Sequence, residues 1–375
     1  MAVLKILVIN AGSSSLKTSL FELDRDAGEG ESPSGLLWEA HDNGTDNLEK
    51  ILGELSSHSI DAIGHRVVFG GSELSATTRV DNNVRQKLAR MVEYAPAHNA
   101  AALKGIDTAT RLFGESTPQF AVFDAEFHRT LPEAAYTYAG PYAWREKGIR
   151  KFGFHGLSHR YASHRAAKLV AGLPMSSRIV TCHLGSGCSL AAVKDGQSVD
   201  TTMGFTPMDG IPMARRSGAI DPGILLHLLR HSGETLDSLD RMLNRDSGLA
   251  GLSGMSGDMR EILAGVDSGN DRAKLALDVF VHHVRQGIAS MAASMYGIDA
   301  LVFTGGVGEK ASRVREMVCD GLGFLGIVVD KERNQTATGE VVVSAEASAV
   351  SVLVIPSEEN WMIARECRQL WSSST

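Results

Sequence analysis

Three turns rich in glycine and serine follow apolar segments of the chain and are its clearest candidates for chemistry. They lie at residues 10–17 (NAGSSSLK), 183–189 (HLGSGCS) and 304–310 (TGGVGEK). Small residues let the backbone approach a ligand closely, and serine hydroxyls add hydrogen-bond donors for phosphate oxygens. One such turn would be an ordinary hairpin, but three in one chain favour phosphate binding.

The phosphate site that these turns predict is neither of the two standard nucleotide loops. The sequence has no Gly-Lys dipeptide, which excludes a Walker A loop, and no G-x-G-x-x-G follows the first apolar segment. Paired glycine turns that face each other across two lobes are a different cradle for a nucleotide, and we expect that arrangement.

Four basic side chains lie near these turns or in other glycine-rich segments. Lys17 follows the first turn, Arg66 stands between apolar residues in GHRVVFGG, Arg216 lies in the irregular segment MARRSGAIDP, and Arg260 lies in SGDMR. A buried arginine is costly unless it meets an anion. Each alone could be a structural ion pair, or a solvated lysine for Lys17, but their shared setting supports an anion site.

Histidines and one aspartate could add a metal or anion contact. His155 and His159 have the i, i+4 spacing of a helical metal site, but Gly153 and Gly156 disfavour a helix. We therefore expect hydrogen bonds to an anion rather than a zinc ion. Asp124 ends an apolar strand, where it could orient a ligand or metal, or only cap the following turn.

The last apolar strand is followed by two further carboxylates. Glu358 and Glu359 come directly after this strand and Pro356, with Asn360 next to them. Such a pair is a plausible contact for Mg²⁺, which keeps several waters and needs few protein ligands.

The elements that must position these residues mix strands and helices throughout. Residues 3–9 and 16–23 predict a hairpin, residues 24–47 mainly a loop, and residues 177–196 a second hairpin of similar pattern. Two such hairpins, each opening about half of the chain, suggest two related halves. Further strands are expected at 60–71, 118–128, 298–304 and 349–355, and helices at 48–58, 81–94, 271–296 and 360–371. The expected class is α/β.

The composition of the chain argues against several classes of partner and site. The chain has 375 residues with 37 Lys and Arg against 44 Asp and Glu, a net charge of −7, which argues against nucleic acid. Its four cysteines lack metal or redox spacing, so we expect buried, reduced thiols. No apolar run reaches the length of a membrane span, and the N-terminal apolar segment is too short for a signal peptide. We expect a soluble, cytoplasmic protein.

The motifs in their order resemble the acetate kinase family. The segments are NAGSSSLK, GHRVVFGG, VFDAEFHRTLP, KFGFHGLSHRY, CHLGSG, DTTMGFTPMDG, RSGAIDPG, FTGGVGE and PSEENWMIA, and they cover essentially the whole chain. The resemblance implies duplicated ribonuclease H-like domains of the actin-like ATPase type, as two lobes around a cleft. The expected lobes are 1–127 with 361–375, and 128–360, the second carrying most of the nucleotide site.

The resemblance also implies an activity: reversible, Mg²⁺-dependent transfer of the ATP γ-phosphoryl group to acetate, giving acetyl phosphate and ADP by direct in-line transfer. Mn²⁺ could replace Mg²⁺, and family members are usually homodimers. A propionate kinase of the same fold and a non-catalytic, actin-like ATP-binding protein are the alternatives.

Site residues follow from the resemblance position by position. Asp124, Arg66, His155 and Arg216 are the implied catalytic residues, and Asn10 and Glu359 the implied metal contacts. The implied acyl-binding residues are Arg66, Val68, Ala97, Phe154 and Pro207. The implied nucleotide site comprises Lys17, His183, Leu184, Gly185, Ser186, Gly187, Asp258, Met259, Arg260, Gly306, Val307, Gly308, Glu309 and Lys310.

Several positions depart from the family pattern. Ser186 stands where Asn is common, Leu157 where Thr is common, and Gly257 where Ser is common. The segment PSEENW leaves Glu358 or Glu359 as the metal carboxylate, and the register favours Glu359. Ala97 replaces a larger apolar residue of the acyl pocket, which leaves room for one or two methylenes and predicts measurable activity on propionate.

Overall fold

The computed structural model describes residues 3–12, 16–25, 33–42, 44, 47–55, 57–71, 73–93, 96–170 and 177–373. The side chains of Glu93, Pro96, Ala97, His98 and Ser373 are outside that description. The chain divides into two compact units, residues 1–129 with 358–375, and residues 130–357. The lobes expected from sequence met at 127/128 and 360/361, which placed Glu359 in the C-terminal lobe, whereas contacts assign it to the first unit.

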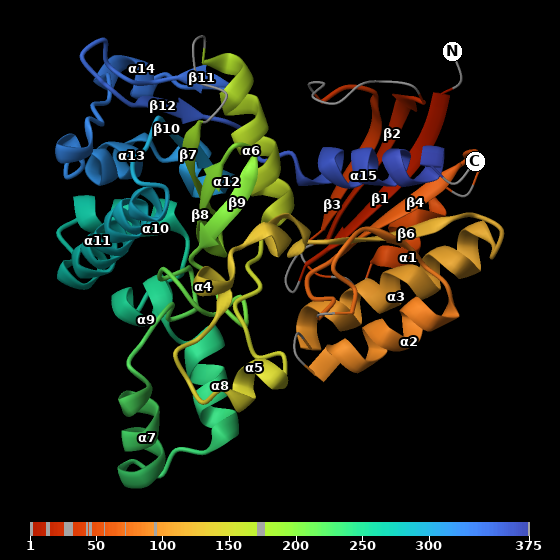
Figure 1. Cartoon of the computed structure of the whole chain (residues 1–375), viewed down its shortest axis with the longest axis horizontal. Coiled ribbons are helices and arrows are strands. Elements are labelled where there is room, and N and C mark those ends of the chain that lie inside the picture. The colour runs from red at the N-terminus through yellow and green to blue at the C-terminus, as the bar shows by residue number, and fades with distance from the viewer. Residues whose placement is uncertain are drawn as a thin grey trace. The chain divides into compact units, whose positions relative to one another are not determined.

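The first unit is built on a six-stranded mixed sheet with the order β3-β2-β1-β4-β6-β5 (Figure 1). β1, β2 and β3 are antiparallel neighbours, and β1, β4 and β6 run parallel. The strands are β1 (Val3–Ala11), β2 (Leu16–Asp24), β3 (Leu36–Asp42), β4 (Ala62–Val67), β5 (Thr78–Arg79) and β6 (Gln119–Phe123).

Helices cover both faces of this sheet. α1 (Leu48–Gly53) and α3 (Pro96–Phe113) share a hydrophobic core with β1 and β2, and α2 (Asn82–Arg90) packs in a neighbouring core. The C-terminal helix α15 (Glu359–Ser373) lies on the other face. Trp361 of α15 contacts Phe21 with ring centroids 5.9 Å apart. A Cβ on Gly64 of β4 would lie 2.6 Å from Cys367 Sγ, so the absence of a side chain permits this close packing.

The second unit repeats the same topology. Its sheet has the order β9-β8-β7-β10-β12-β11, which matches the first sheet strand for strand in order and direction. The strands are β7 (Arg178–Leu184), β8 (Cys188–Lys194), β9 (Gln197–Thr201), β10 (Ala300–Thr304), β11 (Val341–Val342) and β12 (Ser351–Val354). The expected α/β class and duplicated, ribonuclease H-like halves are therefore confirmed.

Two long helices sandwich the second sheet. α6 (Gly156–Leu169) contacts β7 and β10, and α11 (Asp271–Ser294) contacts β7, β8 and β9. Successive side chains of a strand point to opposite faces, so Ser189 of β8 faces α6 while Leu190 faces Gly287 of α11.

Shorter helices connect these elements. They are α4 (Glu133–Tyr136), α5 (Ala143–Glu146), α7 (Pro222–His231), α8 (Leu236–Arg245), α9 (Gly248–Ser253), α10 (Met259–Asp267), α12 (Gly305–Lys310), α13 (Ser312–Cys319) and α14 (Lys331–Gln335). Within the described residues there are also three 3₁₀ segments: η1 (Met91–Glu93), η2 (Glu126–Thr130) and η3 (Gly323–Leu325).

Two expectations from sequence are corrected. Residues 24–47, expected mainly as loop, contain the edge strand β3, whose side chains are mostly exposed and whose sequence LLWEAHD lacks the alternation of apolar and polar residues that predicts a strand. The glycines around His155 do not prevent a helix, because α6 begins at Gly156 and His155 occupies the left-handed position just before it, with φ 56°. His155 therefore precedes the helix that contains His159, and the two residues do not lie on successive turns of one helix.

The cysteines match the expectation of buried thiols. All four cysteines are free and buried. Among the described residues, no helix is long and apolar enough to cross a membrane.

A buried histidine of the first unit is part of a chain of hydrogen-bonded polar side chains. His65 of β4 is fully buried, and its Nε2 donates to Gln119 Oε1 at 2.7 Å, while Gln119 Nε2 donates to Thr110 Oγ1 at 2.8 Å. Its Nδ1 atom has no hydrogen-bond partner among the described residues. Burial lowers the pKa of His65 from its ordinary value of 6.5 to about 4, although the bond to Gln119 opposes the shift.

We predict that His65 makes stability fall in mild acid. Between pH 6.5 and 4, His65 is protonated in the unfolded chain but stays neutral in the folded chain. The free energy of unfolding is therefore unaffected by His65 above pH 6.5 and decreases towards pH 4. The loss should approach about 3 kcal/mol at pH 4. The urea midpoint measured from pH 7 to pH 4 should fall less steeply for His65→Gln than for the natural chain. His58→Gln, a change at an exposed histidine, is the control; equal slopes for all three proteins would contradict the prediction.

Candidate active site

The carboxyl ends of β1, β4 and β6 bring four of the sequence-predicted residues together. Asn10 lies near the end of β1, Arg66 near the end of β4, and Asp124 directly after β6. Parallel strands end at the same edge of a sheet, which is where α/β proteins bind ligands. Glu359 reaches this edge as the first residue of α15.

Arg66 is the centre of this cluster. Its Nε and one terminal nitrogen donate to the two carboxylate oxygens of Asp124, at 2.9 and 2.6 Å. The other terminal nitrogen donates to Asn10 Oδ1 at 3.1 Å, and Glu359 Oε1 lies 3.8 Å from the guanidinium. Asp124 is buried and Arg66 nearly so. A planar, two-point pair of this kind fixes the orientation of the arginine.

Burial and the charge of the partner have opposite effects on the pKa of each member of this pair. Burial alone would lower the pKa of Arg66, but the negative charges of Asp124 and Glu359 raise it. Burial raises the pKa of the Asp124 carboxyl, and the charge of Arg66 opposes that shift. With all three groups ionised, one positive and two negative charges leave the cluster one charge negative.

An amide chain orients Asn10. Its Nδ2 donates to Asn360 Oδ1 at 2.9 Å and lies 3.4 Å from Glu359 Oε2, while Asn360 Nδ2 donates to Ser19 Oγ at 2.8 Å. These bonds direct the carbonyl oxygen of Asn10 towards Arg66. The sequence placed Asn360 beside the two glutamates but gave it no function, and nothing in the β2 pattern singled out Ser19.

The cluster has the chemistry of a magnesium contact. Carboxylate and amide oxygens from Glu359 and Asn10 are ligands that Mg²⁺ prefers, and the excess negative charge favours a cation. In the described part of the chain, no three His, Cys, Asp or Glu side chains gather as a metal site. Few protein ligands suit an ion that takes its other ligands from water and phosphate.

A second cluster forms in the second unit where β7 turns into β8. The ring of His155 stacks on that of His183 with centroids 4.3 Å apart. A Cβ on Gly187 would lie 3.2 Å from the His155 ring and 3.6 Å from a terminal nitrogen of Arg216, so glycine keeps this approach open. The same nitrogen of Arg216 donates to the carbonyl oxygen of Pro207 at 3.1 Å. These predicted residues are therefore neighbours.

The third glycine turn lies beside the second. Thr304 at the end of β10 pairs in register with His183 of β7, and Gly305, with φ 77°, begins α12 against the backbone of Leu184. The buried hydroxyl of Thr304 has no hydrogen-bond partner among the described residues. A Cβ on Gly306 would meet nothing within 4 Å, so this turn is open for a ligand.

Further residues predicted for the nucleotide site lie close to the same turns. The Ala214 backbone donates to the Ser186 carbonyl, and a Cβ on Gly257 would lie 2.4 Å from the Ala214 oxygen. That approach explains glycine at 257, next to the Asp258 N-cap of α10. Arg260 is almost fully exposed and pairs with Asp258 at 2.5 Å.

Other predicted residues are placed as follows. Glu309 Oε1 accepts from the Ser357 backbone at 2.9 Å, and Lys17 is exposed on β2 opposite Asn10. Val68, Phe154, Leu184 and Met259 are buried, Pro207 is half-buried, and Val307, Gly308 and Lys310 lie in α12. Ala97 lies in the first turn of α3, but its side chain is outside the described structure.

The four predicted catalytic residues thus divide equally between the units. Arg66 and Asp124 form the cluster of the first unit, and His155 and Arg216 that of the second.

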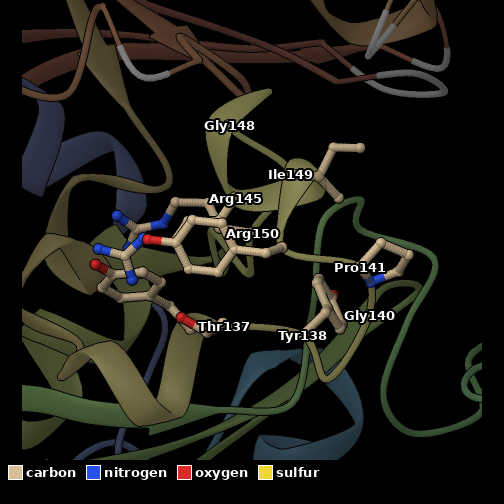
Figure 2. Close-up of a pocket in the computed structure, with 10 residues that line it drawn as sticks. Thr137, Tyr138, Gly140, Pro141, Arg145, Gly148, Ile149 and Arg150 are labelled. Carbon is tan, nitrogen blue, oxygen red and sulfur yellow. The ribbon is translucent and has the colours of Figure 1, made fainter.

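A separate cavity of about 290 Å³ lies in the second unit between residues 136 and 150 (Figure 2). Arg150 lines it, with its guanidinium 3.6 Å above the Tyr136 ring. Its lining residues include none of the described residues predicted for the site. The polar clusters, rather than this cavity, define the candidate site.

Comparisons with known proteins identify the family of the chain. The acetokinase family matches residues 36–365 of the chain. The acetate kinase of Nostoc sp. (strain PCC 7120) is 45% identical over 406 residues, covering 98% of this chain and 99% of the relative. The acetate kinase of Gloeobacter violaceus is 46% identical over 402 residues, with the same coverage.

Solved structures give the same result. The crystal structure of Porphyromonas gingivalis acetate kinase matches with a TM-score of 0.86 and 36% identity, covering 98% of this chain and all of that one. A propionate kinase from Francisella tularensis matches with a TM-score of 0.87 and 35% identity, covering 98% and 99%. With the family match spanning most of its length, and its relatives matching end to end, the chain belongs to the acetokinase family.

Proposed function

We propose that this chain is an acetate kinase, which transfers the γ-phosphoryl group of ATP reversibly to acetate. The observation that carries this proposal is identity of about 45% to acetate kinases over 98% of the chain. An acetate oxygen forms the new bond to phosphorus, the bond from phosphorus to the ADP oxygen breaks, and ADP leaves with that electron pair. Acetate is already ionised at neutral pH, so the reaction needs no base to activate it.

Positioning and positive charge are what the protein must supply. Arg66 and Arg216 serve this purpose as the guanidinium groups that hold the acetate and the transferring phosphoryl group. Asp124 does not need to take a proton, because its two oxygens already hold the guanidinium of Arg66. We therefore assign Asp124 to the alignment of Arg66. His155 stabilises the transition state as a hydrogen-bond donor.

Asn10 and Glu359 would hold Mg²⁺, or Mn²⁺ in its place, which would shield the charge of the phosphates when bound. The turns at 183–187 and 305–310, with Asp258–Arg260, would receive the nucleotide, and Lys17 would contact a phosphate. The open backbone at Gly306 and the buried Thr304 hydroxyl support this assignment.

Val68, Ala97, Phe154 and Pro207 would form the wall of the acyl site. The small side chain of Ala97 and the likeness to a propionate kinase structure favour propionate as a second substrate. A non-catalytic, actin-like ATP-binding role is disfavoured, because the chain retains Arg66, Asp124, His155 and Arg216.

We also infer a cytoplasmic homodimer. An ATP-dependent reaction on acetate fits the cytoplasm. No residue of α7 is buried, although its sequence is PGILLHLLRH. Ile224 and Leu226 are 49% and 50% exposed. The apolar residues of α7 before Arg230 suit the same helix of a second copy, since self-complementary contacts close a dimer.

The proposed function predicts that ADP forms from ATP only when both acetate and a divalent cation are present. Arg216→Ala should lower kcat about 10³-fold or more, because it removes positive charge from the transferring group. Arg215→Ala, at the exposed neighbouring arginine, should change kcat by no more than about threefold. A coupled ADP assay measures both.

A rate of ADP release that is independent of acetate would contradict the proposed function. Near-normal turnover of folded Arg216→Ala would remove Arg216 from the mechanism. Arg66→Ala is a less clean test than Arg216→Ala, because it leaves the Asp124 carboxylate buried without its arginine.

The acyl site should accept propionate. Each additional methylene in an apolar pocket is worth about 1–3 kcal/mol, so Ala97→Val should lower kcat/KM for propionate relative to acetate by about tenfold or more. Ala100→Val, at an exposed position of the same helix, is the control. The measurement is kcat/KM on acetate, propionate and butyrate; a steep preference of the natural chain for acetate would contradict it.

The chain should have twice its 40.1 kDa mass by light scattering. Leu226→Glu places a charge on the apolar face of α7 and should yield the monomer. Phe324→Glu, at an exposed apolar residue outside α7, should leave the dimer intact. A dimer that survives Leu226→Glu would place the interface elsewhere.

A further inference from the structure

Ser189 lies between two histidines on the α6 face of the second sheet. Its hydroxyl oxygen is 2.9 Å from His155 Nδ1 and 2.7 Å from His159 Nε2. The other nitrogen of His159, Nδ1, is 2.7 Å from Thr181 Oγ1. A continuous chain of hydrogen bonds therefore runs from Thr181 through His159 and Ser189 to His155.

This chain is buried at every link before His155. Thr181, His159 and Ser189 are each completely inaccessible to solvent. Water therefore does not satisfy the hydroxyl hydrogens, which need acceptors inside the protein. Within the described structure, the hydroxyls of Thr181 and Ser189 make only the hydrogen bonds of this chain.

Counting hydrogens gives the chain a direction. A hydroxyl has one hydrogen, and a neutral imidazole has one N–H and one acceptor nitrogen. If Thr181 donates to His159 Nδ1, then His159 Nε2–H donates to Ser189, and Ser189 donates to His155 Nδ1. Every buried hydroxyl hydrogen then has an acceptor.

The opposite direction is costly. If His155 Nδ1–H donated to Ser189, then Ser189 would donate to His159 Nε2, and His159 Nδ1–H would donate to Thr181. The hydroxyl hydrogen of Thr181 would then be buried without an acceptor in the described structure, which is a strongly unfavourable arrangement. Thr181 therefore selects the first direction, in which His155 carries its hydrogen on Nε2.

The Nε2 atom of His155 faces the side where chemistry is expected. A Cβ on Gly187 would lie 3.2 Å from this atom, and 3.6 Å from the nearest terminal nitrogen of Arg216. The stacked ring of His183, itself bonded through Nδ1 to Ser158 Oγ at 2.8 Å, restricts rotation of the His155 ring. An N–H held in this place can donate to a transferring phosphoryl oxygen.

We infer that Thr181, His159 and Ser189 are positioning residues that fix His155 as an Nε2–H donor for phosphoryl transfer. The inference rests on the proposed function for its catalytic part, but the tautomer itself is independent of it. Removing any link frees the other tautomer, in which Nε2 is an acceptor and repels an anionic oxygen.

Nitrogen NMR of histidine side chains tests the tautomer directly. In protein labelled with ¹⁵N-histidine, the His155 signals, assigned by their loss in His155→Asn, should show hydrogen on Nε2. Thr181→Val keeps the side-chain shape but removes the donor, so the Nδ1–H form should gain population. A natural protein with His155 protonated on Nδ1 would overturn the inference.

Kinetics test the consequence. Ser189→Ala and Thr181→Val should lower kcat about 10–100-fold, the effect of removing partners that orient metal-bound histidines, with little change in KM for ATP. Ser189→Thr retains the hydroxyl and should restore most of kcat. Ser163→Ala is the matched control, because its buried hydroxyl in α6 donates only to the Arg160 backbone at 3.1 Å.

The outcomes separate the two proposals. An unchanged kcat for Ser189→Ala, or equal losses for Ser189→Ala and Ser163→Ala, would overturn the positioning role. A natural protein without acetate-dependent ADP release, but with His155 protonated on Nε2, would remove the proposed function and leave the tautomer assignment standing.

Discussion

A guanidinium buried at the end of a β-strand requires negative charge beside it, and most of the first unit's site follows from how Arg66 meets that requirement. Asp124 supplies both oxygens of its carboxylate, which is possible because β4 and β6 are parallel neighbours that end at the same edge. Removing either partner would leave a buried charge uncompensated, so the pair constrains both strands. Asn10 then accepts a hydrogen bond from the other terminal nitrogen of Arg66, and Glu359 lies 3.8 Å from the guanidinium.

The duplication of the fold places the predicted site residues at corresponding positions of the two sheets. In each unit the first strand pairs antiparallel with the second, and the neighbouring parallel strand ends at the same edge. The first unit uses this edge for Asn10 and Arg66, while the second uses it for His183 and Thr304. The same edge of the sheet thus carries the charged pair of Arg66 and Asp124 in one unit and the open backbone of Gly306 in the other. A shared architecture can in this way hold different kinds of site.

The sequence was informative wherever local patterns determine structure. Apolar strands followed by glycine turns predicted both hairpins, and Asp124 was correctly placed at a strand end. Sequence patterns failed where contacts with distant residues determine the structure. β3 exposes most of its side chains and pairs with β2 along its length, and α6 begins directly after His155, which adopts the left-handed conformation. The bonds of Ser189 and Asn360 join residues 30 or more positions apart, and no spacing rule reports such contacts.

The helix α15 closes the first unit with the last residues of the chain, and this has a consequence for synthesis. The second unit lies between the two parts of the first unit in the chain, so it is synthesised while the strands from residues 3–123 still lack the helix that covers one face and carries Glu359. During translation at about 5–20 residues per second, the part made first is therefore finished last. Until α15 is made, the sheet face that it covers lacks its packing partner, so the first unit can complete its fold only after the second unit has been synthesised.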